Sequence, residues 1–138
     1  MATKKKLTFA LMDPPFENAR TVTTMRLIDI AARRGHEIIV FAYEGAVGHA
    51  FAKQAKHANA AHGHDLAQED HPLAREWVAN ILAASQAAGG KIDWINCGLC
   101  VDERGVGEFI HGTRRGSPAD LLKAAEGSDN SLVIGTRG

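Results

Sequence analysis

Short apolar runs alternate along the chain with longer segments whose apolar residues recur at helical spacing. The runs rich in β-branched and aromatic residues are 7–12, 36–43, 91–96 and 131–136. Their length and composition are typical of β-strands. Residues 91–96 alternate between apolar and polar side chains, whereas the other runs are nearly continuous. Near-continuous apolar runs predict strands that are covered on both faces.

Amphipathic segments separate these runs and predict helices at residues 21–34, 71–88 and 118–127. Gly35 stands where the residue after a helix adopts a left-handed conformation, and Pro72 suits the first turn of the second helix. Ser117 and Asp120 have the spacing of a capping box. The second helix is expected to bury a stripe made of Leu73, Trp77, Ile81, Ala84 and Ala88.

Regular alternation of strand and helix predicts an α/β fold. We expect one domain over residues 1–138, with a mostly parallel sheet of four to five strands and helices on both faces. Residues 107–116 are expected to form either a further short strand or a partial helix, and the pattern does not separate these two.

The composition limits the classes of protein to which this chain can belong. The chain has 138 residues, 45% hydrophobic and 23% charged, which is ordinary for one globular domain. The 16 basic and 16 acidic residues balance, so we expect no direct nucleic-acid binding. No apolar run reaches the ~20 residues that span a bilayer, and no apolar region of a signal peptide follows Lys4–Lys6. A cytoplasmic protein without membrane contact is therefore expected.

The segment 45–70 is long for a connection in a compact domain. Its first part, 46–61, is alanine-rich and a weak candidate helix, and 62–65 has the character of a loop tip. The histidines at 57, 62, 64 and 71 are candidate metal ligands, but their spacing matches no familiar zinc pattern. We therefore expect a loop without a resident metal.

Two cysteines lie directly after the third predicted strand. Ligands and reactive groups of open parallel sheets gather at the carboxyl ends of strands, so Cys97 and Cys100 stand where chemistry is expected. A cysteine reacts as its thiolate, and Arg104 is a candidate cation to favour that form. The alternative is that both cysteines only pack as small apolar side chains. A zinc site is disfavoured because the chain has no second pair of cysteines.

A second candidate site is the loop 13–18 after the first strand, where some α/β folds bind phosphate. It has no glycine and carries two acidic residues, which disfavours nucleotide or flavin binding. Arg114, Arg115 and Arg137 form either a small anion-binding patch or ordinary surface charge. No cofactor is expected.

The cysteine motif C-x-x-C-x-D-x-R-G, from Cys97 to Gly105, resembles that of the DsrE/DsrF-like sulfur carriers, in particular the YchN-like members. The first predicted strand and helix, followed by 41–47, resemble the opening of TusD-like and DsrE subunits. The last helix and strand also fit the family, so the resemblance covers nearly the whole chain. The stretch 49–71 is longer than the family's pattern, and no role is carried over to it.

This resemblance implies a persulfide relay with Cys97 as the sulfur-bearing residue, because the single cysteine of TusD-like members lies seven residues before the arginine, as Cys97 does before Arg104. Cys100 is the additional cysteine of YchN-like members. The resemblance also implies persulfide donor and acceptor proteins such as a TusA-like carrier, acting in tRNA thiolation or sulfur oxidation, and a homotrimer or homohexamer. The alternative function is a non-catalytic oligomeric module with a thiol/disulfide switch.

Overall fold

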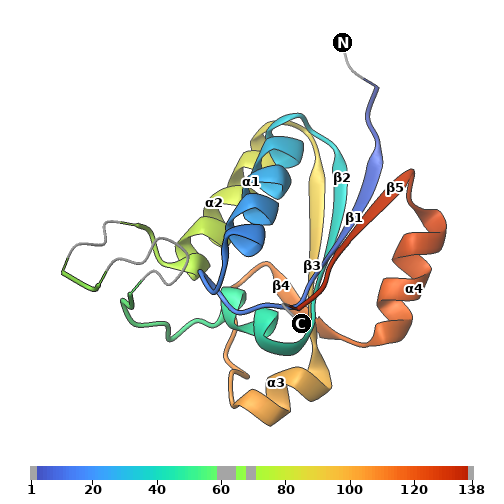
Figure 1. Ribbon diagram of the computed structural model, residues 1–138. Helices are drawn as coiled ribbons and strands as arrows, with labels where there is room; N and C mark the ends of the chain where they lie inside the picture. Colours follow the sequence, from blue (N-terminus) through green and yellow to red (C-terminus); the bar gives the residue numbers. More distant parts are fainter. Residues whose placement is uncertain (1–2, 59–64, 68–70, 137–138) are drawn as a thin grey trace.

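The chain folds around one parallel sheet, described by a computed structural model for residues 3–58, 65–67 and 71–136 (Figure 1). The strands are β1 (Lys6–Leu11), β2 (Glu37–Ala42), β3 (Lys91–Cys97), β4 (Thr113–Gly116) and β5 (Asn130–Ile134). The helices are α1 (Ala19–Arg33), α2 (Ala74–Ala87), α3 (Gly98–Arg104) and α4 (Pro118–Gly127), with a short 3-10 helix, η1 (Glu44–Ala50).

The five strands lie in the order β4-β3-β2-β1-β5, and every neighbouring pair is parallel. Figure 1 shows α1 and α2 side by side on one face of the sheet, α4 on the other face, and α3 beyond the carboxyl ends of the strands. The expected α/β fold with helices on both faces is confirmed. Its largest fully buried side chains include Trp94, Phe41, Leu11 and Met25.

The first helix begins two residues earlier than the apolar pattern predicts, because Asn18 caps it. The Asn18 side chain accepts a hydrogen bond from the backbone N–H of Thr21 at 3.1 Å and donates one to the Asp13 carboxylate at 2.5 Å. At the other end Gly35 adopts a φ of +75°, as predicted for the residue that ends this helix.

The second helix differs from its prediction in register. It begins at Ala74, so Pro72 lies before the helix and not in its first turn, and the Glu76 carboxylate accepts a hydrogen bond from the backbone N–H of Leu73 at 3.2 Å. The helix also buries a different face from the one predicted. The buried residues of α2 are Ala74, Val78, Ile81 and Ser85, so only Ile81 of the predicted stripe is fully buried.

The last strand is present, but it is not the buried strand that its apolar sequence predicts. β5 pairs only with β1 and forms an edge of the sheet, which leaves Val133 63% exposed. The other edge strand is β4. Of the two structures expected within 107–116, a short strand or a partial helix, the short strand is the one present.

The segment after β2 forms η1, and residues 51–58 after it are not helical, so the candidate helix 46–61 is wrong for its described part. Residues 59–61 lie outside the described residues. His49 is buried in η1, whereas His57 and His71 pack on the ring of Phe16, with centroid distances of 5.6 Å and 4.0 Å. The predicted ligands His62 and His64 lie outside the described residues. None of the described helices is both long and apolar enough to cross a membrane.

Candidate functional site

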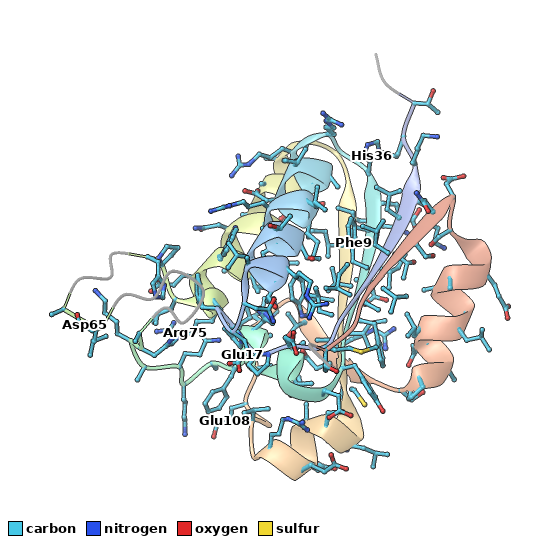
Figure 2. The ribbon with its side chains drawn as sticks, in the orientation of Figure 1. Phe9, Glu17, His36, Asp65, Arg75 and Glu108 are labelled. Carbon is cyan, nitrogen blue, oxygen red and sulfur yellow. The ribbon has the colours of Figure 1, made fainter. Side chains whose placement is uncertain are left out.

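The two cysteines lie where β3 runs into α3. Cys97 is the last residue of β3 and Cys100 lies in the first turn of α3, at the carboxyl end of the sheet. Figure 2 shows this end, near the label of Glu108, opposite the end where His36 lies. Both cysteines are free thiols and both are covered, with 2% of Cys97 and 3% of Cys100 exposed.

The Cys100 thiol is held in its protonated form. Burial raises its pKa to about 11, and a hydrogen bond with the neighbouring Cys97 thiol acts in the same direction. The backbone N–H of Glu44 donates to the Cys100 sulfur at 3.2 Å and acts in the opposite direction, but burial dominates. Cys100 is therefore a poor nucleophile near neutral pH as long as it stays buried.

Glu44 links η1 to α3 through both its backbone and its side chain. It has a φ of +52°, a left-handed conformation that costs a non-glycine residue energy and that here directs its N–H at Cys100. Its carboxylate accepts a hydrogen bond from Arg104 at 2.8 Å. Arg104 also lies 3.6 Å from the Glu103 carboxylate, so the guanidinium group of this predicted site residue forms ion pairs with two acidic side chains.

A different arginine lies beside the other cysteine. A Cβ atom placed on Gly98, the residue after Cys97, would lie 2.5 Å from Nε of Arg115. The two terminal nitrogens of Arg115 donate to the Asp102 carboxylate at 2.9 Å and 2.7 Å. This carboxylate, and more weakly the Cys97 sulfur, raise the pKa of Arg115.

An aromatic residue completes the surroundings of the thiols. The pKa of Tyr43 is raised, first by the carboxylate of Glu44 and then by the nearby Cys100 thiol, with a smaller contribution from Cys97. Tyr43 follows β2, the strand beside β3, and its ring stacks on Phe41 at a centroid distance of 6.1 Å.

The sequence placed Cys97, Cys100 and Arg104 at this site. It named Arg115 only within a candidate anion-binding patch, apart from the cysteines, and it did not select Tyr43 or Glu44. A signal for Tyr43 and Glu44 was present, because Tyr43 ends the second predicted strand, Glu44 follows it, and parallel strands end at the same edge of a sheet. Arg115 could not be placed beside the cysteines, since the pattern of residues 107–116 does not separate a strand from a helix.

The other candidate sites do not join the cysteines. In the loop 13–18, Asp13 is buried and hydrogen bonds to Asn18, so its carboxylate faces the protein. His49 is fully buried, and its Nε2 lies 3.2 Å from the backbone oxygen of Asp13. Within the described parts of the chain, no three histidine, cysteine or acidic side chains gather in a way that could hold a metal ion.

The fold and the site together define a class of protein: a parallel α/β sheet with two free cysteines at the carboxyl end of β3, an interior strand. Comparison with known proteins assigns the family. The model of the DsrE/DsrF-like family matches residues 5–134, and the chain belongs to this family. The search of curated proteins found no match.

A solved structure supports the fold. The crystal structure of the YchN protein from E. coli is similar with a TM-score of 0.72 and 17% sequence identity. The similarity covers 94% of this chain and 99% of that one. The family assignment and this similarity agree with the family resemblance of the cysteine motif.

Proposed function

We propose that this protein is a cytoplasmic sulfur carrier that holds sulfane sulfur as a persulfide on Cys97. The observation that carries the proposal is the position of Cys97, the last residue of a central strand, in a chain of the DsrE/DsrF-like family. This family is generally associated with sulfur relay.

The proposed reaction needs only the thiols. The Cys97 thiolate attacks the outer sulfur of a persulfide donor, the donor's sulfur–sulfur bond breaks, and the donor leaves as a thiolate. An acceptor thiolate then takes the same sulfur by the reverse exchange. No metal or organic cofactor enters either step, and the sulfur keeps its oxidation state.

Cys100 has a second role in this scheme. Its thiol hydrogen bonds to Cys97, so the two sulfurs are neighbours, and it can attack a persulfide on Cys97. That attack would form a Cys97–Cys100 disulfide and release hydrogen sulfide, which balances electrons without an external oxidant. We therefore assign Cys97 as the carrier and Cys100 as the residue that resolves or tunes it.

The partners in this proposal are a persulfide donor protein and an acceptor such as a TusA-like carrier, within a sulfur relay or sulfur oxidation. The protein itself acts as one DsrE-like domain over 1–138, assembled as a homotrimer or homohexamer.

A second function is favoured by the same neighbouring thiols. Two free cysteines in contact at the start of a helix are suited to a reversible disulfide, which would make the protein a redox switch. This reaction removes two electrons and requires an oxidant, whereas persulfide formation from a sulfane donor does not.

Mass spectrometry distinguishes the two functions. After incubation with thiosulfate, polysulfide or a persulfidated carrier protein, the wild-type chain and Cys100→Ser should gain the mass of one sulfur atom, and Cys97→Ser should not. Gain of sulfur by Cys97→Ser at the wild-type rate would exchange the roles of the cysteines. If no protein gains sulfur and the wild type loses two hydrogens under a mild oxidant, the redox switch becomes the function and the sulfur carrier is excluded.

A further inference from the structure

The guanidinium group of Arg115 lies over the turn that joins Cys97 to α3. An ideal Cβ on Gly98 would come within 2.5 Å of its Nε, 2.9 Å of its Cζ and 3.0 Å of one terminal nitrogen. The first two distances are shorter than those that real Cβ atoms show, and the third is at the limit. The space that glycine leaves at position 98 is therefore filled by the charged end of Arg115.

Asp102 fixes the guanidinium in this place. Asp102 lies one turn after Gly98 on α3, and its carboxylate accepts two hydrogen bonds from the terminal nitrogens of Arg115, at 2.9 Å and 2.7 Å. This two-pronged pairing sets the orientation of the planar group as well as its distance. It also leaves Nε, the nitrogen nearest to Gly98, outside both bonds to Asp102.

The strand register brings Arg115 to this position. β3 and β4 are parallel neighbours, with Asn96 opposite Arg115 and Cys97 opposite Gly116. The electrostatic effect of the Cys97 sulfur on Arg115 agrees with this placement. Arg104, in contrast, is bound to Glu44 at the other end of α3.

We propose that Arg115, positioned by Asp102 over Gly98, is the cation that stabilises a negative sulfur on Cys97 and that favours anionic sulfane donors such as thiosulfate. This inference deepens the proposed function and rests on it for its biological meaning. A doubly negative donor and a thiolate repel each other, and a fixed cation beside the thiolate offsets that repulsion.

The reaction with thiosulfate balances without another reagent. The Cys97 thiolate attacks the outer sulfur, a new sulfur–sulfur bond forms, and the bond to the sulfonate sulfur breaks. Sulfite leaves with the electron pair of that bond, and the persulfide stays on Cys97 as an anion. Both the attacking and the product sulfur are negative, so one cation serves the whole step.

The test compares two alkylating reagents of similar size, iodoacetate, which is anionic, and iodoacetamide, which is neutral. Rates are measured for Cys97 in a Cys100→Ser background, where Cys97 is the single cysteine. Because both reagents need the same opening of the buried site and the same thiolate, these factors cancel in the ratio of the two rates. The ratio therefore reports the charge beside the sulfur.

Arg115→Gln should lower the iodoacetate to iodoacetamide ratio about three- to five-fold, the effect of one charge at a few ångströms near water. Arg114→Gln is the matched control. Arg114 is the neighbouring residue of the same strand, so its side chain points to the opposite face of the sheet, where it pairs with Asp93 at 2.8 Å. This variant should keep the ratio. An equal ratio in the Arg115 and Arg114 variants would overturn the inference.

Gly98→Ala provides a second test that keeps every charge. The added methyl group should displace the flexible end of Arg115 and lower the ratio in the same direction, while alanine at a helical position is well tolerated. An unchanged ratio would overturn the role given to Gly98. A lowered ratio in Arg104→Gln, with no change in Arg115→Gln, would return the role to Arg104.

These outcomes are separable from failure of the proposed function. Alkylation requires no sulfane sulfur, so its ratio decides the role of Arg115 even if the wild-type protein accepts no sulfur. If the wild-type protein does accept sulfur, Arg115→Gln should slow uptake from thiosulfate more than alkylation by iodoacetamide. Equal slowing of both reactions would overturn the preference for anionic donors.

Discussion

The backbone N–H of Glu44 points at the sulfur of Cys100 from 3.2 Å, and the two residues belong to segments that are 56 positions apart in the chain. An amide donor at this distance favours a negative sulfur, yet burial keeps Cys100 protonated. The site thus contains a donor that becomes useful only when Cys100 loses its proton. This combination has a direct consequence for reactivity.

In a Cys97→Ser variant, Cys100 should react with iodoacetamide near neutral pH at least about ten-fold more slowly than the same thiol in the urea-unfolded chain. The physical reason is a pKa raised to about 11 by burial, which leaves little thiolate. The rate should climb as the pH rises toward that value. A folded protein that reacts as fast as the unfolded chain would contradict the buried, protonated state of Cys100.

His49 should make the fold sensitive to acid. Complete burial lowers its pKa from 6.5 to about 4, so the folded state binds the proton less readily than the unfolded chain. The stabilising contribution is therefore fully present above about pH 6.5 and is lost as the pH falls toward 4. Across that range the loss amounts to about 3 kcal/mol of the free energy of unfolding.

The measurement is urea unfolding of the wild type and of His49→Gln near neutral pH and near the folded-state pKa. Glutamine keeps a donor for the Asp13 carbonyl but does not titrate. The variant should be less stable near neutral pH and should lose less stability in acid. Parallel losses in the two proteins would show that other groups cause the acid sensitivity.

Gly35 and Gly89 form a matched pair for testing backbone crowding. Both have left-handed conformations, with φ of +75° and +77°, but a Cβ on Gly35 would lie 2.7 Å from the backbone oxygen of Ala88, whereas one on Gly89 meets nothing within 4 Å. Gly89→Ala should cost about 1 kcal/mol of unfolding free energy, from the conformation alone. Gly35→Ala should cost about 1–2 kcal/mol more, because backbone atoms must move. Equal losses in urea unfolding would contradict the close approach at Gly35.

The oligomeric state can be tested through α1. Leu27 and Ile30 are 40% and 48% exposed on this helix, and we propose that they lie in the contact between subunits of the expected homotrimer or homohexamer. In sedimentation velocity the wild type should exceed its 14.8 kDa monomer mass, and Leu27→Glu should shift it toward the monomer. A monomeric wild type at micromolar concentration would contradict the expected assembly.

Much of the fold was predictable because its elements carry local signals. The strand 36–43 is a dense β-branched and aromatic run, and the capping sequence that begins at Ser117 fixes the start of α4 within one residue. Which strands lie at the edge of the sheet, and are therefore only partly buried, was less predictable. An apolar sequence such as 131–136 does not show whether its strand lies inside a sheet or, like β5, at its edge, because that depends on which strand it pairs with.

The site was predictable in part for the same reason. Cys97 and Cys100 carry the signal in their own spacing and in the strand before them. Glu44 and Arg115 reach the cysteines only through the parallel pairing of β2, β3 and β4, and nothing in their local sequence marks that contact. The charge pattern alone favoured Arg104, which is close to the cysteines along the chain but is drawn to the Glu44 carboxylate in the fold.

The covering of both thiols, with only 2% and 3% of each cysteine exposed, bears on how such a protein would keep its cargo. Glutathione and other small thiols reduce a persulfide by approaching along the axis of its sulfur–sulfur bond, and the covered thiols give such a reagent little room. Sulfur held here would be shielded from wasteful loss as free sulfide. Delivery would then depend on an acceptor that gains access to this covered end of the sheet, so that recognition, and not the intrinsic reactivity of the sulfur, decides where it goes.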